Sequence, residues 1–416
     1  MIPKGQKLAS NPGNHRPISL ISCVCKVVER LVAQRLSSFL ASKNLLIKQQ
    51  SGFRRGRRTS DNLVFLSQKI TESFSRGKKV LAFFFDIQAA FDTVWHNGLV
   101  YKLIQMGIPV YLVYWIVNFL ADRWFVVRVD GSISERARVV FGVPQGSALS
   151  PILFSVFIND VPANFAENDS FTLLFADDLN TFYIYRKITP ALRNKVNRYL
   201  KDIERWLCRW RLNMAPSKCQ YTIFEKCKRV EANFEAKLFG ERIPYEAHPV
   251  SLGVTFDATL SFRKQTEVIR AKCLGRLNVI KILSHRSWKL TQDTLVAIYR
   301  TLVGSVIDYS FFMVSQLSDR TMKRVQVIQN SAMRYIFKKS RKCPTEILCS
   351  LSDLPRVGAR MLELNDRYFE ASCKFANELI LDLARGFMRS FPPTREIPYK
   401  TLLCDFRHML ETVVFI

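Results

Sequence analysis

Two apolar runs that each end in aspartate constrain the fold of this chain more than any other sequence feature. Residues 80–85 read VLAFFF and are followed by Asp86, which suits a fully buried strand with a carboxylate at its open end. Residues 171–185, FTLLFADDLNTFYIY, place Asp177 and Asp178 between two strand-forming halves, so a tight hairpin is expected there. Adjacent residues of an extended chain point to opposite faces, so we expect one acid to face a common site and the other to lie at its margin.

An isolated pair of acids in a turn is most often simply solvated, but the third acid changes the interpretation. Burying a carboxylate is costly unless it is paired or coordinates a metal. If the two strand ends lie side by side in one sheet, Asp86, Asp177 and Asp178 come together. Hard oxygen ligands in that number suit Mg²⁺, and two such ions stabilise the attacking and leaving oxygens of a phosphoryl transfer.

Two further motifs suit a phosphate-bearing ligand. The loop GVPQGS, which starts at residue 142, lets the backbone approach a ligand closely, and its Gln145 offers both an amide donor and an acceptor. The stretch GFRRGRRT, residues 52–59, supplies four arginines, whose forked guanidinium groups match phosphate oxygens. An ordinary strand–loop–helix junction and a solvated basic loop are the plain alternatives.

The charge balance indicates a polyanionic partner. The chain of 416 residues carries a formal net charge of +27, with 62 Lys and Arg against 35 Asp and Glu. Such an excess repels itself in a compact fold, so nucleic acid is the first candidate partner and a membrane surface the second. No apolar run is long enough to span a bilayer, so no membrane insertion is expected. Ten cysteines without a disulfide or zinc-finger framework indicate an intracellular protein with reduced thiols, in either nucleus or cytoplasm.

The order of the predicted elements indicates an α+β domain followed by helices. Residues 19–40 predict a helix with Ile21, Val24, Val28, Leu31 and Leu36 near its period, and a hairpin is expected to turn at Asp130-Gly131. A helix capped by Thr189 follows, with an apolar stripe of Leu192, Val196, Tyr199, Ile203, Trp206 and Trp210. Later, Ile269, Cys273, Leu277 and Ile280 line one face of a basic helix whose other faces carry Arg270, Lys272 and Arg276. That basic surface is either solvated or lies against a phosphate backbone.

Seven motifs in order resemble those of one family, the reverse transcriptases of non-LTR retrotransposons of the LINE type, close to the jockey-like elements. The resemblance covers about residues 2–283. It is carried by IPKGQKLASNPGNHRPISLISCVCKVVERLVAQRL, QSGFRRGRRTSDNL, FFFDIQAAFDTVWHNGLVYKL, GVPQGSALSPILFSVFINDV, LLFADDLNTF, LNMAPSKCQYTIF and VSLGVTFD. It implies a right-hand polymerase fold with fingers, a palm with an antiparallel sheet and a helical thumb, followed by a helical C-terminal region. The implied ranges are 1–257 for fingers and palm, 258–340 for the thumb and 341–416 for the C-terminal region.

The resemblance also implies roles for individual residues. Asp86, Asp177 and Asp178 match the family's catalytic triad and metal ligands for two Mg²⁺ ions, with Mn²⁺ as a substitute, and the carbonyl of Ile87 adds a ligand. The residues matched to nucleotide binding are Arg54 and Arg58 at the triphosphate, Phe91 against a 2′-hydroxyl, Gln145 near the sugar and Lys218 near the leaving pyrophosphate. Arg270, Lys272 and Arg276 would bind nucleic acid. Asp92 and His96 are interpreted as structural, and Trp206 and Trp210 as core.

The implied reaction is extension of a DNA primer 3′-hydroxyl by deoxynucleotides on an RNA template. The motifs begin at the first residues, so we expect a copy without the endonuclease that this family carries upstream. Ala89 and Leu179 depart mildly from the family pattern. Two alternatives stay open: an inactive, nucleic-acid-binding remnant of a truncated element, and a basic peripheral membrane protein, which leaves the acids unexplained. The sequence does not define the oligomeric state.

Overall fold

A four-stranded antiparallel sheet is the centre of the computed structural model. The structure describes residues 2–3, 15–129, 131–162, 169–226, 234–391, 399 and 401–405. The strand order is β10-β3-β9-β8, with bounds Gln220–Phe224, Lys79–Asp86, Asp178–Tyr185 and Ser170–Phe175. The continuous apolar sequence of β3 forms a strand because both faces of the sheet are covered, as the buried side chains from Val80 to Phe85 show.

One face of the sheet packs against helices from the first half of the chain. This face carries Leu81, Phe83 and Tyr183, which share a core with α1 (Cys23–Ser42), α3 (His96–Gln105), α4 (Val110–Leu120), α5 (Ser150–Phe157) and α6 (Pro190–Trp210). As predicted, the Thr189 hydroxyl caps α6 by accepting the Leu192 N–H at 3.2 Å. Trp206 and Trp210 are confirmed as core residues of this face.

The opposite face of the sheet packs against α2 (Thr59–Ser75) and the helices that follow the sheet. Phe84, Phe182 and Phe224 share one continuous core with residues as late as Leu403. The later helices are α7 (Arg263–Leu283), α8 (Gln292–Tyr299), α9 (Ser305–Asp308), α10 (Asp319–Ile336), α11 (Thr345–Ser352), α12 (Val357–Lys374), α13 (Glu378–Ser390) and α14 (Leu402–Asp405). The short helices η2 (Arg286–Trp288) and η4 (Phe311–Met313) and the π-helix η3 (Arg300–Gly304) join them.

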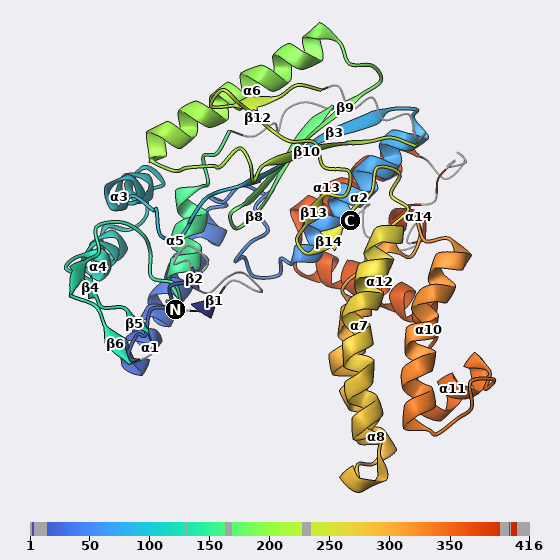
Figure 1. Cartoon of the computed structure of the whole chain (residues 1–416). Coiled ribbons are helices and arrows are strands. Elements are labelled where there is room, and N and C mark those ends of the chain that lie inside the picture. The colour runs from blue at the N-terminus through green and yellow to red at the C-terminus, as the bar shows by residue number, and fades with distance from the viewer. Residues whose placement is uncertain are drawn as a thin grey trace.

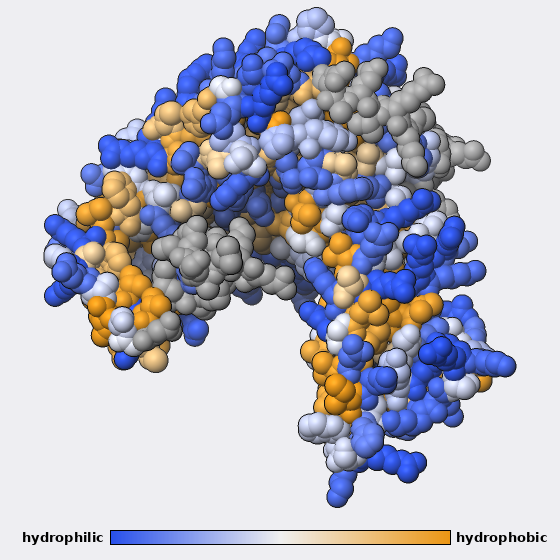
Figure 2. Space-filling model, in the orientation of Figure 1, coloured by the Kyte–Doolittle hydropathy of each residue, from blue (hydrophilic) through white to orange (hydrophobic). Residues whose placement is uncertain are grey.

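The molecule is an arch with two arms (Figure 1). One arm holds α1, α4 and a hairpin. In this hairpin, β4 (Trp124–Phe125) pairs with β7 (Ala137–Arg138), and β5 (Arg128–Val129) pairs with β6 (Ser132–Ile133) nearer the turn. The predicted hairpin is therefore present, although Asp130 in its turn lies outside the described residues. The other arm holds α7, α8, α10 and α11. Figure 2 shows the surface hollowed between the two arms below the sheet.

Three further pairs of strands lie in the described residues. They are β1 (Ile2–Pro3) with β2 (His15–Arg16), β11 (Lys237–Leu238) with β12 (Glu241–Arg242), and β13 (Val250–Ser251) with β14 (Val254–Thr255). Within the described helices, none has the length and apolarity needed to cross a bilayer.

The prediction for the buried face of α1 was wrong. Val24, Val28 and Leu31 are exposed by 77%, 40% and 57%, and the buried positions are Glu29, Val32, Leu36 and Leu40. The helix is therefore rotated so that a glutamate faces the interior. The reason lies in a contact with a distant loop, which is described with the site below.

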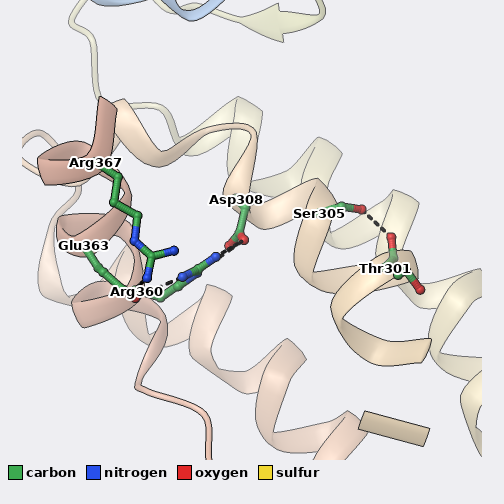
Figure 3. Close-up of polar contacts among 6 residues, drawn as sticks. All are labelled: Thr301, Ser305, Asp308, Arg360, Glu363 and Arg367. Carbon is green, nitrogen blue, oxygen red and sulfur yellow. Dashed lines mark hydrogen bonds and ion pairs between the residues drawn. The ribbon is translucent and has the colours of Figure 1, made fainter. Parts of the chain in front are cut away.

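Ion pairs tie the late helices together. Arg360 of α12 donates to Asp308 of α9 at 3.3 Å and to Glu363 at 3.0 Å, and Arg367 contacts Glu363 on the same helix (Figure 3). Nearby, the Ser305 hydroxyl donates to the Thr301 carbonyl across the end of the π-helix. Tyr299, Asp308 and Arg360 also line a cavity of about 430 Å³ between these helices. None of the three predicted catalytic aspartates lines this cavity.

Candidate active site

The three predicted aspartates meet at one end of the sheet. Asp86 is the last residue of β3, Asp178 is the first residue of β9, and the two are direct cross-strand partners. Opposed residues of an antiparallel pair project from the same face, with Cβ atoms about 4.5–5.5 Å apart. Asp177 lies in the turn between β8 and β9. The prediction that two strand ends bring these acids together in one sheet is confirmed.

The turn before the acids is tight and strained. Phe175 pairs with Asp178, so only Ala176 and Asp177 connect the two strands. Ala176 has a φ of +54°, in the left-handed region that costs an L-residue roughly 1–2 kcal/mol. The Ala176 N–H donates to the side-chain oxygen of Gln50 at 3.1 Å, which holds the turn in this shape. The strained backbone of Ala176 fixes the position of the next residue, Asp177.

Burial and neighbouring acids raise the pKa values of Asp177 and Asp178. Burial, followed by the charges of Asp177 and Asp86, raises the pKa of Asp178 to about 6. Burial is also the main cause of the raised pKa of Asp177, to which the charge of Asp86 adds while its own backbone amide and Arg16 oppose the shift. Carboxylates whose charged forms destabilise one another provide a site for a cation, because a divalent ion reverses the repulsion.

The donor set fits a hard divalent cation that shares its ligands with a substrate. Within the described part of the chain, no three or more His, Cys, Asp and Glu side chains form a ready-made metal cluster. Mg²⁺ is usually bound by only one or two carboxylates and otherwise by water and substrate phosphates. The facing pair Asp86 and Asp178, with Asp177 in the adjoining turn, meets that requirement.

Lys218 and Ile87 flank the aspartates on the β10 side. The Lys218 Nζ lies 3.9 Å from the Asp86 carboxylate, and its side chain is 53% exposed. Ile87 forms an isolated bridge with Met214, in the segment between α6 and β10. This segment therefore runs beside the end of β3, which places the half-exposed Lys218 ammonium group next to Asp86.

Phe91 packs in a small cluster of aromatic rings. It stacks on Phe154 of α5 with ring centroids 5.0 Å apart, and Phe53 meets it edge-on at 6.1 Å. The Phe91 carbonyl also accepts the Val143 N–H at 2.8 Å. Phe91 is thus a rigid ring held between the loop at residue 142 and the arginine loop at residue 53.

The loop of residues 142–149 is held from both sides. The side-chain amide of Gln145 donates to the Asp92 carboxylate at 2.8 Å, and the backbone carbonyl of Gln145 accepts the Ser19 N–H at 2.7 Å. Gly142 has a φ of +86°, and a Cβ there would lie 2.8 Å from the Asp92 carbonyl oxygen. The interpretation of Asp92 as structural agrees with its contact, because it orients Gln145.

Glu29, which was not predicted from the sequence, anchors this loop from α1. Its side chain is fully buried, and it accepts the Ala148 N–H at 2.9 Å and the Cys25 thiol at 3.4 Å. A buried carboxylate needs such donors, which explains why α1 turns this residue inward. The available signal was its spacing, since Glu29 is in helical register with Val32, Leu36 and Leu40.

The arginine loop lies close to the aspartates, but its arginines differ in position. The Arg54 guanidinium donates to the carbonyls of Ile47 at 2.9 Å and Gln50 at 3.3 Å, and burial lowers its pKa. Arg58 precedes α2 and is exposed, with its backbone N–H bonded to Asp61. Arg57, which was not predicted, bonds to Asn377 of the C-terminal helices. Arg58 therefore has the freer guanidinium of the two predicted residues.

The three predicted nucleic-acid-binding residues of α7 also differ. Arg270 and Lys272 are exposed. Arg276 is half-buried and donates to the Leu302 carbonyl in η3, so it ties two helices of the arm together. The buried face of α7 is the predicted one, made of Ile269, Cys273, Leu277 and Ile280.

The antiparallel sheet carries paired aspartates at a hairpin and lies above the hollow between the two arms. This arrangement defines the palm of a right-hand polymerase. The family model described as "Reverse transcriptase (RNA-dependent DNA polymerase)" matches residues 2–263. The chain belongs to the reverse transcriptase family, and within it to the relatives of non-LTR retrotransposon enzymes.

Curated relatives come from insect mobile elements. The probable RNA-directed DNA polymerase from transposon BS of Drosophila melanogaster is 32% identical over 342 residues, which are 81% of this chain and 37% of that protein. The corresponding protein of the X-element from the same species is 31% identical over 95% of this chain and 43% of its own length. The RNA-directed DNA polymerase of mobile element jockey from Drosophila funebris is 27% identical over the same two shares. The chain thus spans about two fifths of the length of these relatives.

Solved structures show a more distant likeness. Apo telomerase from Candida tropicalis aligns with a TM-score of 0.41 at 11% identity, covering 93% of this chain and 61% of that one. Telomerase from Candida albicans in complex with a fragment of telomeric RNA aligns with a TM-score of 0.41 at 11% identity, covering 94% and 58%.

Proposed function

We propose that this chain is an RNA-directed DNA polymerase that extends a primer 3′-hydroxyl with deoxynucleoside triphosphates on an RNA template. The observation that carries the proposal is the direct pairing of Asp86 with Asp178 beside the turn that holds Asp177. The family match and the relatives named as RNA-directed DNA polymerases support it. Residues 1–257 would form fingers and palm, 258–340 the thumb and 341–416 a helical C-terminal region.

Divalent metal ions are general to this family. Two Mg²⁺ ions, or Mn²⁺ in their place, would be held by Asp86, Asp177, Asp178 and the Ile87 carbonyl, and would stabilise the attacking and leaving oxygens. With its carboxylates at the end of the sheet and Lys218 beside Asp86, the protein would position a triphosphate for in-line attack.

The other predicted residues would set the substrate. The ring of Phe91, fixed by Phe154, would leave no room for a 2′-hydroxyl, and Gln145, fixed by Asp92, would contact the sugar. Arg58 has the exposed guanidinium that a triphosphate requires, and Arg54 would shape the loop around it. Lys218 would protonate the leaving pyrophosphate. Arg270 and Lys272 on the second arm would contact the template–primer backbone, with Arg276 holding their helix in place.

The first test is primer extension on poly(rA)–oligo(dT) with Mg²⁺ and dTTP. We expect the wild-type chain to extend the primer and Asp177→Asn to reduce the rate by at least about 10²-fold, the scale of removing one stabilising group from a transition state. The matched control is Asp169→Asn, the same change just before the far end of β8, where the carboxylate pairs with Lys78 at 2.9 Å. Its rate should stay within about twofold of wild type.

A remnant that binds nucleic acid without copying it is the second candidate function, favoured by the net charge of +27. It predicts binding of the RNA–DNA duplex, weakened steeply by salt, with no extension by any variant. Equal extension by wild type and Asp177→Asn would contradict the proposed mechanism itself.

A further inference from the structure

The segment of residues 49–62 is inserted between the catalytic hairpin and the C-terminal helices. On the hairpin side, it continues the sheet beyond β8. The Leu174 N–H donates to the Gln49 carbonyl at 3.1 Å, and the Leu174 carbonyl accepts the Ser51 N–H at 3.0 Å and the Asn62 amide at 2.9 Å. Leu174 is three residues from Asp177, so these bonds fix the hairpin close to its turn.

The side chain of Gln50 contacts the turn directly. Its side chain is 2% exposed, and its oxygen accepts both the Gly52 N–H at 2.8 Å and the Ala176 N–H at 3.1 Å. A Cβ at Gly52 would lie 2.4 Å from the Ala176 nitrogen. Any shift of this segment is therefore transmitted to the residue that precedes Asp177.

On its other side, the segment is fastened to α12 and α13. Asp61 is 1% exposed and accepts the Tyr368 hydroxyl at 2.7 Å and the Arg58 N–H at 2.9 Å. Arg57 bonds to the side chain of Asn377, which is itself buried. At the rim, Lys48 pairs with Asp382 at 2.5 Å.

These polar contacts do more to fix the geometry of the segment than to raise the free energy of unfolding. A buried hydrogen-bonded charge is often no more stabilising than apolar residues of similar volume, whereas it fixes geometry closely when its partners are satisfied. The surrounding core already supplies apolar packing, with Tyr368 and Phe369 in it. The polar contacts instead set the position of residues 57–61 against two helices that are more than 300 residues away in sequence.

We propose that α12 and α13 hold the catalytic turn in place through residues 49–62, with Tyr368 and Asn377 as positioning residues. The inference rests on the proposed function, and it gives the C-terminal region a role in nucleotidyl transfer. Neither residue contacts Asp86, Asp177 or Asp178. The effect passes from Asp61 and Arg57 along the segment, because the Arg57 N–H donates to the Arg54 carbonyl and the Arg54 guanidinium donates to the Gln50 carbonyl, and Gln50 in turn holds Ala176.

The test compares Tyr368→Phe and Asn377→Ala with Tyr299→Phe. The control removes a hydroxyl from another buried tyrosine of the same core, in α8, far from the segment. Hydrogen–deuterium exchange of the Leu174 and Ala176 amides is measured first. We expect exchange to rise about tenfold in Tyr368→Phe and Asn377→Ala and to stay at the wild-type rate in the control. Unchanged exchange in both variants would overturn the proposal.

Primer extension supplies the second readout. We expect kcat to fall about tenfold in Tyr368→Phe. The KM for the template–primer should stay within about twofold, because Arg270 and Lys272, which we propose to contact the nucleic-acid backbone, lie on α7. Full kcat despite faster exchange would show that the turn does not need this support, and would overturn the positioning role. If the wild-type chain copies no RNA at all, the proposed function fails, and the exchange data still decide whether the helices hold the turn.

Discussion

The two faces of the palm sheet are built from different parts of the chain. The face toward α6 is covered by residues 32–243, most of them near the strands in sequence. The face toward α2 collects residues from 63 to 403, so the sheet, the second arm and the C-terminal helices share one core. The neighbours Phe182 and Tyr183 on β9 point into the two cores. Among the described residues, the helices after residue 262 share a core with the sheet on its α2 face and contribute none of the buried core residues of its α6 face.

The two faces also carry opposite charges. On the α2 face, Asp86 and Asp178 project at the site end of the strands, on the same side as Phe84 and Phe182. On the α6 face, Lys102 is buried with its ammonium group 3.6 Å from the centre of the Trp210 ring, bonded to the Phe157 carbonyl and to Asp160. Ionisation of the carboxylates therefore lowers stability on the α2 face, and protonation of Lys102 lowers it on the α6 face.

The largest expected effect comes from breaking the shared core at the sheet. Phe182→Ala should lower the free energy of unfolding by about 3–5 kcal/mol, because it leaves a cavity under a fully buried ring. Urea unfolding measures the loss, and hydrogen exchange should quicken in α2 and α10 as well as in β9. If exchange in α10 stays at the wild-type rate, the second arm does not depend on the α2 face.

The next effect is a pH dependence from the acids of the α2 face. The pKa of Asp178 is raised from 3.8 to about 6 in the folded chain, so the folded state holds a proton that the unfolded state has lost. Stability from this group is present below about pH 4 and is lost as the pH rises through about 6, by on the order of 2 kcal/mol. Urea midpoints at pH 4.5 and 7 in EDTA should show the loss in wild type and a smaller one in Asp178→Asn. A saturating divalent cation at pH 7 should restore stability to wild type only.

The smallest effect has the opposite sign and belongs to the α6 face. Burial lowers the pKa of Lys102 from 10.5 to about 8, against the opposing effect of Asp160. The unfolded state then holds more protons above pH 8, so stability rises with pH, by about 1 kcal/mol between pH 8 and 9. Unfolding of wild type and Lys102→Met at these two pH values checks this. An equal change in both proteins would assign the rise to other groups.

The sequence predicted those parts of the site that depend on local patterns. An apolar run that ends in Asp86, and a hairpin that presents Asp177 and Asp178, were enough to place three acids at one end of a sheet, because strand period and turn chemistry are short-range rules. The cap at Thr189 and the buried face of α7 followed from the same kind of rule.

Contacts between distant segments were not predictable in this way. The inward turn of Glu29 depends on the N–H of Ala148, and the helical period alone favoured the apolar residues on the other side of α1. Likewise, nothing local to Asp61 indicates a bond to a tyrosine 307 residues away. In both cases a buried polar side chain takes its partner from the tertiary structure, and one sequence without that structure does not show the partner.

The two-residue turn between Phe175 and Asp178 makes the site sensitive to length. Side chains alternate between faces along a strand, so one inserted or deleted codon in β9 before Phe182 would exchange the environments of an aspartate and an aromatic ring. A loop could absorb such a change, but a turn this short cannot. A change of one residue in that strand would therefore misplace the acids even if the rest of the fold were kept.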